Sequence, residues 1–384
     1  GAANAVLEKY SNLSKAVDAK NDDGSSNYWV NVLADRSSFV WPINQASNNT
    51  QSLTSTWGNT ASGTTFAQSN ASFNFTLTGG ALQTPTDGLL QNAYSIFADV
   101  DRFDISLVML GAASNTVAKY VIDNVVSAPS GRGDCVAFVS PPMSAVVNNP
   151  GMEAADVVSY AWDPVTGFNP SSYVVMDSGW KKQFDKYNNV YRWVPLNGDI
   201  AGLCARTDYT NAAWWSPAGL NRGLVKNVTQ LAWSPNQTDR DTLYKNSINP
   251  VVTMTGLGTV LYGDKTMTNK PSAFDRINVR RLFIALEKSI SKAAKYSLFE
   301  FNDEFTRAQF VALVEPFLRD VKGRRGIYDY KVVCDETNNT AEVIDSNRFV
   351  GDIYIKPAKS INYIQLNFVA VRTGVAFSEI VGKF

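Results

Sequence analysis

The run Ile105-Ser-Leu-Val-Met-Leu-Gly111 and the run Cys135-Val-Ala-Phe-Val139, with residues 115–126 between them, decide the fold. Both runs are short and apolar, which is typical of strands that are buried on both faces. Residues 115–126 have the apolar spacing of a helix, and so do residues 89–97 before the first run. A strand, a helix and a strand in this order indicate a parallel sheet with helical crossovers. Residues 81–255 are therefore predicted to form an α/β domain with a parallel-type sheet.

The last third of the chain indicates a separate unit with a different order of elements. Apolar residues recur at helical spacing through residues 273–297, which predicts one long helix with Ser272 at its capping position. A second helix is expected to start at Asp303, because carboxylates favour the positive end of a helix, and Pro316 is expected to kink or end it. Strands are expected to follow at residues 327–334, 349–355 and 361–371. Residues 256–384 are thus predicted to form a compact α+β domain with two helices and three strands.

The first 80 residues differ again, because polar stretches rich in Ser, Thr, Asn and Gly separate short β-type runs. The runs are Tyr28-Trp-Val-Asn-Val-Leu33 and Phe73-Asn-Phe-Thr-Leu77. This pattern predicts strands joined by exposed loops. We expect residues 1–80 to be a β-rich segment.

The composition excludes several classes of function. The chain has 35 Lys and Arg against 35 Asp and Glu, and this balance argues against a protein whose main task is binding nucleic acid. It has no histidine, so Ser-His-Asp catalysis, Cys-His catalysis and histidine metal sites are all excluded. Its three cysteines, Cys135, Cys204 and Cys334, lie far apart and form no CxxC pair. No window is apolar enough for a membrane span, and we expect no membrane insertion, metal or cofactor.

An α/β enzyme that binds or hydrolyses a ligand with Asp and Glu chemistry is the alternative hypothesis. Gly111 follows a buried strand, which is where open α/β sheets bind ligands. The acidic pair at Asp303 is explained by a helix start, and the pair at Asp335 lies in a turn between strands. Gly256-Leu-Gly258 lacks the third glycine of a dinucleotide-binding loop and predicts a turn before a strand. The sequence therefore favours a non-enzymatic function.

Arg132-Gly133-Asp134 is a tripeptide that some cell-adhesion proteins use. Because it directly precedes an apolar strand, a tight turn is the preferred interpretation. A secreted adhesin is the competing hypothesis, and it requires the tripeptide to be exposed and mobile.

One side of the helix predicted at residues 273–297 carries a row of basic side chains. They are Arg276, Arg280, Arg281, Lys288, Lys292 and Lys295, with Glu287 as the main opposing charge. Such a row is either a solvated helix face or a surface that docks on an acidic protein partner. The residues alone leave both interpretations open.

Several segments together resemble one known family, the tail sheath proteins of contractile bacteriophages. Three of them are Ala201-Gly-Leu-Cys-Ala-Arg-Thr-Asp208 with Trp215-Ser-Pro-Ala-Gly219, Val260-Leu-Tyr-Gly-Asp-Lys-Thr266, and the stretch from Arg276-Ile-Asn-Val-Arg-Arg-Leu282 to Phe299-Glu-Phe-Asn302. Two more are similar to the branch of large T-even-like phages: Asp185-Lys-Tyr-Asn-Asn-Val-Tyr-Arg-Trp-Val-Pro195 and Ser360-Ile-Asn-Tyr-Ile-Gln-Leu-Asn-Phe368. Because the segments are collinear up to the C-terminus, the chain resembles the C-terminal portion of a longer sheath protein. The resemblance then implies that residues 1–80 are part of an outer domain whose start is missing.

The resemblance implies a structural subunit without catalytic residues, cofactors or metals. It implies hexameric rings that stack helically around a rigid tail tube, and a collective rearrangement that shortens the sheath and drives the tube into the host cell. Expected partners are other copies of the chain, the tail tube protein, and baseplate and tail terminator proteins. The expected location is the phage tail of the virion, after assembly in the cytoplasm of the host bacterium.

The resemblance also implies three groups of functional residues. The C-terminal domain of the family faces the tube, which makes the basic helix a candidate tube contact through Arg280, Arg281, Lys288, Lys292 and Lys295. Strand exchange between subunits is expected to involve the strand and tail residues Ile361, Tyr363, Leu366, Phe368, Val371, Phe377 and Ile380. The alternative is a strand that is internal to the domain, with the exchange made by the tail or by an N-terminal arm. A structural role, with the tryptophans as an anchor between domains, is expected for the signature residues Cys204, Arg206, Asp208, Trp214, Trp215 and Pro217.

Overall fold

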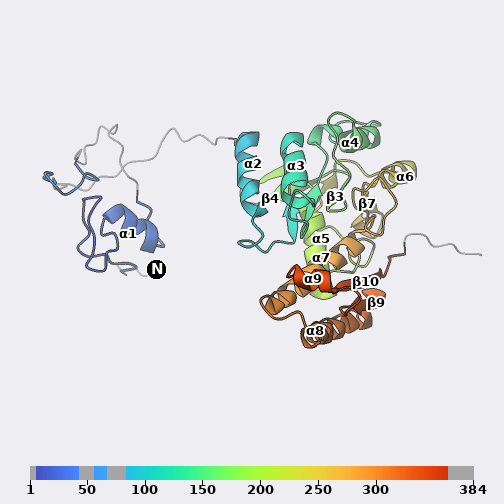
Figure 1. Ribbon diagram of the computed structural model, residues 1–384. Coiled ribbons are helices and arrows are strands. Elements are labelled where there is room, and N and C mark those ends of the chain that lie inside the picture. Colours follow the sequence, from blue (N-terminus) through green and yellow to red (C-terminus); the bar gives the residue numbers. More distant parts are fainter. Residues whose placement is uncertain (1–5, 43–55, 67–83, 362–384) are drawn as a thin grey trace, which may run out of the picture. The chain divides into compact units, whose positions relative to one another are not determined.

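The computed structural model describes residues 6–42, 56–66 and 84–361 (Figure 1). The chain divides into two compact units, residues 1–83 and residues 84–384, and each is described by itself.

The described residues of the first unit contain the helix α1 (Trp29–Arg36) and isolated strand bridges. The strand predicted at residues 28–33 is therefore wrong. Tyr28 and Val32 are both buried, but Val30 between them, which alternation would bury as well, is only half-buried, so the burial follows a helical period. The run predicted at residues 73–77 lies outside the described residues.

A three-stranded parallel sheet lies at the centre of the second unit. Its strands are β1 (Leu107–Met109), β2 (Val136–Val139) and β3 (Val174–Met176), in the order β1-β2-β3. Both pairings are parallel, which confirms the parallel sheet and the two strands predicted from the sequence. Alternate residues of β2 enter different cores, since Ala137 packs in one cluster and Phe138 in the other. The sheet is thus buried on both faces.

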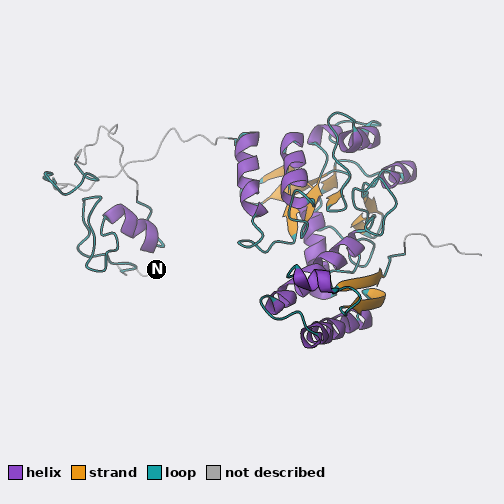
Figure 2. Cartoon of the chain, in the orientation of Figure 1, coloured by secondary structure: helices purple, strands orange, loops and turns teal. Residues whose placement is uncertain are grey.

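Helices cover both faces of this sheet (Figure 2). The Ala137 side is covered by α2 (Asp87–Ser95), α3 (Asn115–Tyr120), its π-helical continuation η2 (Val121–Val126), the turn η3 (Met143–Ala145) and α4 (Glu153–Trp162). The short 3-10 helix η1 (Ile96–Ala98) extends α2 and is exposed. The Phe138 side is covered by α5 (Asn197–Thr210). Thr86 and Ser114 cap α2 and α3 by accepting a backbone N–H with their hydroxyl oxygens. The helices predicted at residues 89–97 and 115–126 are confirmed.

Two small antiparallel sheets complete this part of the unit. One has the order β5-β4-β6, with β4 (Trp180–Asp185), β5 (Val190–Pro195) and β6 (Gln230–Leu231). The other follows α6 (Gln237–Lys245) and pairs β7 (Val251–Met254) with β8 (Gly258–Leu261). Gly256 and Gly258 have φ values of 78° and 84°, a left-handed conformation that glycine adopts at low cost. The turn predicted there is confirmed, because the strand β8 and not a helix follows it.

The C-terminal part packs two long helices against a hairpin. Its elements are α7 (Ile277–Ala294), η4 (Lys295–Ser297), α8 (Glu304–Gly323), β9 (Ile327–Val333), α9 (Ala341–Asp345) and β10 (Asp352–Pro357). Leu282 and Leu286 of α7 share a buried cluster with Val314 and Leu318 of α8. Asp303 caps α8, as predicted, by accepting the Thr306 N–H at 2.8 Å.

Two expectations for this part need correction, and a third is answered in part. The helix α7 begins at Ile277 rather than after Ser272, because Arg276 has an extended backbone and pairs with Lys265 in an antiparallel bridge. Of the two effects predicted for Pro316, it does not end α8, which continues to Gly323, and the kink stays a prediction. The strand β10 begins at Asp352 rather than at residue 349, and the strand predicted at 361–371 lies outside the described residues apart from Ile361.

Candidate functional site

The basic side chains in the second half of α7 contact the acidic loop that precedes β1. Lys288 donates to Asp104 at 2.9 Å and lies 3.5 Å from the carboxylate of Asp134, while Lys292 donates to Asp104 at 2.7 Å. Hydrogen bonds from Lys292 and then Lys288 lower the pKa of Asp104 to about 2. These ion pairs join α7 to the α/β part of the same chain.

Arg280 and Arg281 are buried, with 6% and 5% of their surfaces exposed. The guanidinium of Arg280 stacks between Tyr173 and Phe274, at 4.1 and 3.9 Å from the ring centres, and Arg281 forms an ion pair with Asp208. The expectation of an exposed basic row is therefore wrong for these two residues. The aromatic faces and the carboxylate replace part of the water that the two guanidinium groups lose on burial, while Nε of Arg280 and Nη1 of Arg281 have no hydrogen-bond partner among the described residues.

Lys292 and Lys295, at the end of α7, keep an exposed surface. The side chains of both are 69% exposed, against 17% for Lys288. Lys295 lies 3.9 Å from the exposed Asp101, and an ion pair of this kind contributes little to stability. A role of the basic row in tube contact stays a prediction.

The signature cysteine and its neighbours lie on α5. Cys204 is fully buried, and this burial raises the pKa of its thiol to about 11, so the nucleophilic thiolate is scarce at neutral pH. Arg206 donates to the carbonyl oxygen of Arg222, and Asp208 pairs with Arg281 of α7. The contacts of this segment hold α5 to the following loop and to α7.

The two signature tryptophans lie between basic side chains. Trp214 donates its indole N–H to the carbonyl oxygen of Arg324 at 3.1 Å and packs against Gly326, where an added Cβ would meet the ring at 3.1 Å. Trp215 stacks with Arg222 and Arg325, at 5.1 and 5.4 Å from the ring centre. The indole of Trp214 therefore connects the loop after α5 to the end of α8, and the buried Pro217 follows both rings.

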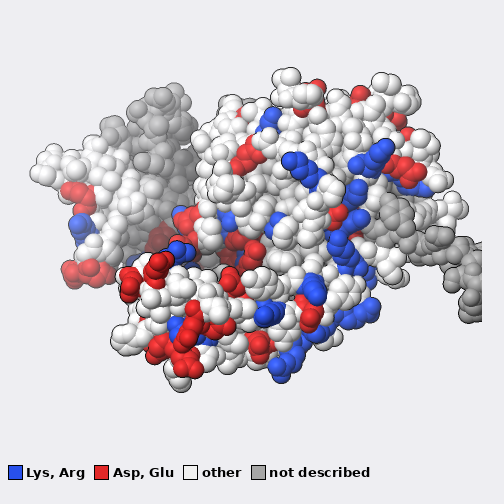
Figure 3. Space-filling view, turned by 45° about the vertical axis from the view of Figure 1, so that its right-hand side comes forward, with Lys and Arg blue, Asp and Glu red and all other residues white. Residues whose placement is uncertain are grey.

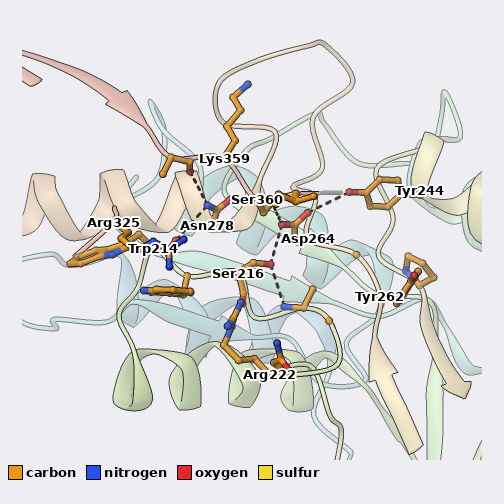
Figure 4. A pocket seen from close by; sticks show the side chains of 18 of the residues that line it. Trp214, Ser216, Arg222, Tyr244, Tyr262, Asp264, Asn278, Arg325, Lys359 and Ser360 are labelled. Atoms are coloured by element: carbon orange, nitrogen blue, oxygen red, sulfur yellow. Dashed lines mark hydrogen bonds between the residues drawn. The ribbon is translucent and has the colours of Figure 1, made fainter. Parts of the chain in front are cut away.

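A pocket of about 1150 Å³ lies beside these tryptophans (Figure 4). Its lining includes Trp214, Trp215, Arg222, Tyr244, Tyr262, Asp264, Asn278, Arg325 and Ser360. The carboxylate of Asp264 accepts from Ser216 at 3.0 Å and from Ser360 at 2.6 Å, and it pairs with Arg276 at 3.1 Å. Both carboxylate oxygens are thus engaged, so Asp264 fixes structure rather than offering a base to a substrate.

Asp264 also explains why separate signature segments occur together. Ser216, Asp264, Arg276 and Ser360 belong to four different segments of the resemblance, and the side chains of the other three meet at the carboxylate of Asp264. We did not single out Asp264 from the sequence. The signal that could have found it is an acid in the middle of an otherwise neutral and basic signature.

The carboxyl end of β1, where the enzyme hypothesis expects a ligand, is closed by a side chain. Asn197 donates to the carbonyl oxygen of Gly111 at 2.7 Å and accepts its N–H at 3.2 Å. Nearby, Asp177 accepts from Ser140 at 2.7 Å and from the Gly179 N–H at 2.9 Å. Burial raises the pKa of Asp177 to about 8, but the residue is only 1% exposed, which places it away from any substrate.

The tripeptide Arg132-Gly133-Asp134 is held inside the chain. The side chain of Arg132 is 0% exposed and pairs with Asp134 at 2.7 Å. Its guanidinium also donates to the carbonyl oxygens of Phe97 and Phe103, both at 2.7 Å. The adhesin hypothesis required an exposed tripeptide and is therefore wrong.

The remaining candidate residues are placed only in part. Ile361 is exposed, and the other strand and tail candidates, Tyr363, Leu366, Phe368, Val371, Phe377 and Ile380, lie outside the described residues. Within residues 6–42, 56–66 and 84–361, no three His, Cys, Asp or Glu side chains are grouped to hold a metal ion. In the same part of the chain, no helix has the length and apolar character needed to cross a membrane.

The sequence is similar to known proteins along most of its length. The family model "Phage tail sheath protein central domain" matches residues 90–267, and "Phage tail sheath C-terminal domain" matches residues 269–370. The tail sheath protein of Vibrio phage KVP40 is 51% identical over 304 residues, which are 75% of this chain and 45% of that protein. The tail sheath protein of Enterobacteria phage T4 is 48% identical over 319 residues, or 80% and 48% of the two chains. The tail sheath protein of Salmonella phage ViI is 38% identical over 380 residues, or 99% and 55%.

Solved structures show the same fold at lower identity. The anti-feeding prophage helical sheath in its contracted state has a TM-score of 0.60 and 18% identity, covering 75% of this chain and 76% of that one. The PVC sheath complex of an extracellular contractile injection system, also contracted, has a TM-score of 0.59 and 18% identity, covering 72% and 74%. This chain spans about half the length of the phage relatives that it matches. With four signature segments joined at Asp264 and two sheath models matching in order, the chain belongs to the phage tail sheath family.

Proposed function

We propose that the protein is a structural subunit of a contractile tail sheath, which assembles as hexameric rings around the tail tube. On contraction the rings rearrange and drive the tube into the host cell. The observation that carries this proposal is the identity of 51% and 48% to two phage tail sheath proteins across the central and C-terminal regions. The likeness to two sheaths in the contracted state supports the same function. Membership of a structural family supports a non-enzymatic role.

In this proposal the parts of the chain have different tasks. Residues 256–384 polymerise and contact the tube, residues 81–255 support them, and residues 1–80 belong to an outer domain. The ion pairs of Lys288 with Asp104 and of Arg281 with Asp208 favour a rigid connection between the first two parts. A rigid connection suits a subunit that moves as one body during contraction.

We assign the tube contact chiefly to Lys292 and Lys295, because their side chains are exposed at the end of α7. Arg280, Arg281 and Lys288 support this contact indirectly, since their intrachain partners hold the helix in place. An acidic surface on the tube is the chemistry that would complement these lysines.

We also propose that the chain from Ile361 onward is exchanged between subunits. The described residues of the C-terminal part form a sheet of β9 and β10, and a pair of strands leaves edges to which a further strand can add. Backbone hydrogen bonds of an added strand would keep neighbouring subunits connected while they move.

Baseplate and tail terminator proteins are further partners. The similarity of this chain to a chain in an anti-feeding prophage baseplate structure supports the first of them. The location is the virion tail, after assembly in the host cytoplasm without nucleic acid or membrane contact.

Electron microscopy of the full-length protein, alone and with the tail tube protein, tests this function. The expected result is a tubular polymer whose bore matches the tube. Replacing Lys292 and Lys295 by Glu should reduce co-assembly with the tube and leave the sheath polymer intact, while Lys245→Glu, at an exposed position in α6, should change neither. Monomers or amorphous material under every condition would contradict the proposal.

A further inference from the structure

An exposed aromatic loop connects α7 to α8. The aromatic loop comprises residues 296–305, and its side chains Tyr296, Phe299, Phe301 and Phe305 are between 75% and 106% exposed. Leu298 adds further apolar surface. Five large apolar side chains exposed within ten residues are unusual on a subunit that functions alone, and such surface marks a contact with another molecule.

The aromatic loop is held in this conformation. Asn302 donates to the carbonyl oxygen of Arg348 at 2.9 Å and accepts from Arg307 at 3.0 Å, and Asp303 caps α8. Phe299 has a φ of 71°, a left-handed conformation that is costly for a bulky side chain. Such strain persists where the surroundings impose it and is concentrated at functional positions. The hydrogen bonds of Asn302 and Asp303 therefore fix the backbone at the end of the loop, from which the rings project into solvent.

A second aromatic surface lies on the hairpin of β4 and β5. We define the aromatic hairpin as residues 182–192, in which Phe184 and Tyr191 pack with ring centres 5.2 Å apart and Tyr187 is 87% exposed. The carboxylate of Asp185 accepts from the Tyr187 N–H at 3.1 Å and from Arg192 at 2.8 Å. These bonds fix the turn, so the hairpin is preorganised for contact as well.

The two surfaces carry opposite charge. The aromatic loop contains Glu300, Asp303 and Glu304 and no basic residue, whereas the aromatic hairpin contains Lys182, Lys186 and Arg192 against Asp185 alone. On the face of the molecule that Figure 3 shows, acidic and basic side chains gather in separate areas. Apolar patches framed by opposite charges are complementary, and the charges set the register in which they meet.

We propose that the aromatic loop of one subunit docks on the aromatic hairpin of a second copy of the same chain. In Figure 1, α8 lies at the bottom of the unit and β4 in its upper part, so one copy presents the two surfaces in different places. A contact between two different patches is heterologous, and it repeats from copy to copy as a helical array requires. The inference rests on the proposed sheath function and names the surfaces through which the copies would meet.

Cross-linking between single-cysteine variants of the full-length protein tests this contact. Tyr187→Cys and Phe299→Cys subunits are mixed, polymerised and treated with a short bismaleimide, and the adducts are identified by mass spectrometry. The native cysteines, Cys135, Cys204 and Cys334, are buried and do not compete. The mixed adduct should form at least about tenfold faster than in a control mixture of Tyr209→Cys with Phe299→Cys, because a held contact raises the effective concentration. Tyr209 is 93% exposed and lies outside both surfaces.

The outcomes separate this contact from the sheath function itself. The docking would be overturned if polymer forms but the mixed adduct appears no faster than the adduct of the control mixture. Rapid cross-linking of Phe299→Cys to the tail tube protein would overturn it as well. A second mixture, Tyr191→Cys with Phe301→Cys, gives the same readout if either first variant fails to fold. Absence of polymer from the unmodified protein would overturn the proposed function, and the inference with it.

Discussion

Replacing Asp177 by Asn should stabilise the protein at pH 8 and have little effect at pH 4. The carboxyl is 1% exposed, and burial raises its pKa to about 8 against the opposing effects of hydrogen bonds from Ser140 and Gly179. Between pH 4 and pH 8 the folded state retains a proton that the unfolded state has lost, so the stability of the wild type falls as pH rises. The slope reaches up to about 1.4 kcal/mol per pH unit.

The asparagine side chain of the Asp177→Asn variant would keep the two hydrogen bonds without a titratable group. Its carbonyl oxygen can accept the Gly179 N–H, and its amide can donate to the Ser140 hydroxyl. The gain in the free energy of unfolding over the wild type should therefore be near zero at pH 4. At pH 8 it should reach on the order of 2 to 5 kcal/mol.

Thermal unfolding followed by tryptophan fluorescence measures this difference, since Trp233 donates to the neighbouring Ser178 at 2.9 Å. Asp163→Asn is a control with the opposite sign, because backbone hydrogen bonds from Thr166 and Val165 lower the pKa of Asp163. Asp163→Asn should therefore be less stable than the wild type at pH values above the ordinary pKa of an aspartate, and equally stable at pH values below the lowered pKa of Asp163.

The result has a bearing on the enzyme hypothesis, because a carboxyl with a pKa near neutrality is a common feature of acid-base catalysts. Our account makes Asp177 a buried structural group, so Asp177→Asn subunits should polymerise like the wild type. If the free energies of unfolding of variant and wild type differ by the same amount at pH 4 and at pH 8, the reasoning that burial raises the pKa of Asp177 is refuted. Loss of polymerisation by a stable variant would refute the structural role.

Three further changes probe the contacts around α5 and α7. Trp214→Ala should lower the free energy of unfolding by about 2 to 4 kcal/mol, because the ring packs on Gly326, and Trp214→Phe should lower it less. Equal losses for the two variants in urea unfolding would argue against packing as the cause. Cys204 should react with a thiol reagent at pH 8 only after unfolding, and rapid labelling of the native protein would contradict its burial. Asp104 has its pKa lowered to about 2, so its stabilising effect is full above about pH 4 and disappears as pH falls through about 2. Asp104→Asn should therefore lower the free energy of unfolding at pH 6 by less than about 1 kcal/mol, because the pair is half exposed, and by much less at pH 2. An equal loss at both pH values would contradict this.

Much of the fold could be predicted because local patterns and tertiary packing agree. The parallel strands at residues 107–109 and 136–139 are continuous apolar runs, and the capping of α8 by Asp303 depends on neighbouring residues alone. The strand predicted at residues 28–33 is wrong because so short a run fits both the alternation of a strand and the spacing of a helix. In the structure, Tyr28 and Val32 are buried and residues 29–36 are helical.

The candidate site was harder to predict because its partners are distant in sequence. Arg280 and Arg281 belong to the same basic row as the exposed Lys292, and only the positions of Tyr173 and Asp208 show that the two arginines are buried. The role of Asp264 likewise depends on residues up to 96 positions away. Sequence periodicity identifies which helix face is apolar, but it does not identify which charge meets which partner across the fold.

A helical reconstruction of the phage tail by cryo-electron microscopy, before and after contraction, tests the central claim most directly. Our account predicts that the fold of residues 84–361 fits the layer outside the tube in both states, with six copies in each ring and the α7 end toward the tube. The subunits should change their mutual positions while the contacts around Asp264 are retained. Density for this fold in the tube itself, or its absence from the tail, would contradict the account.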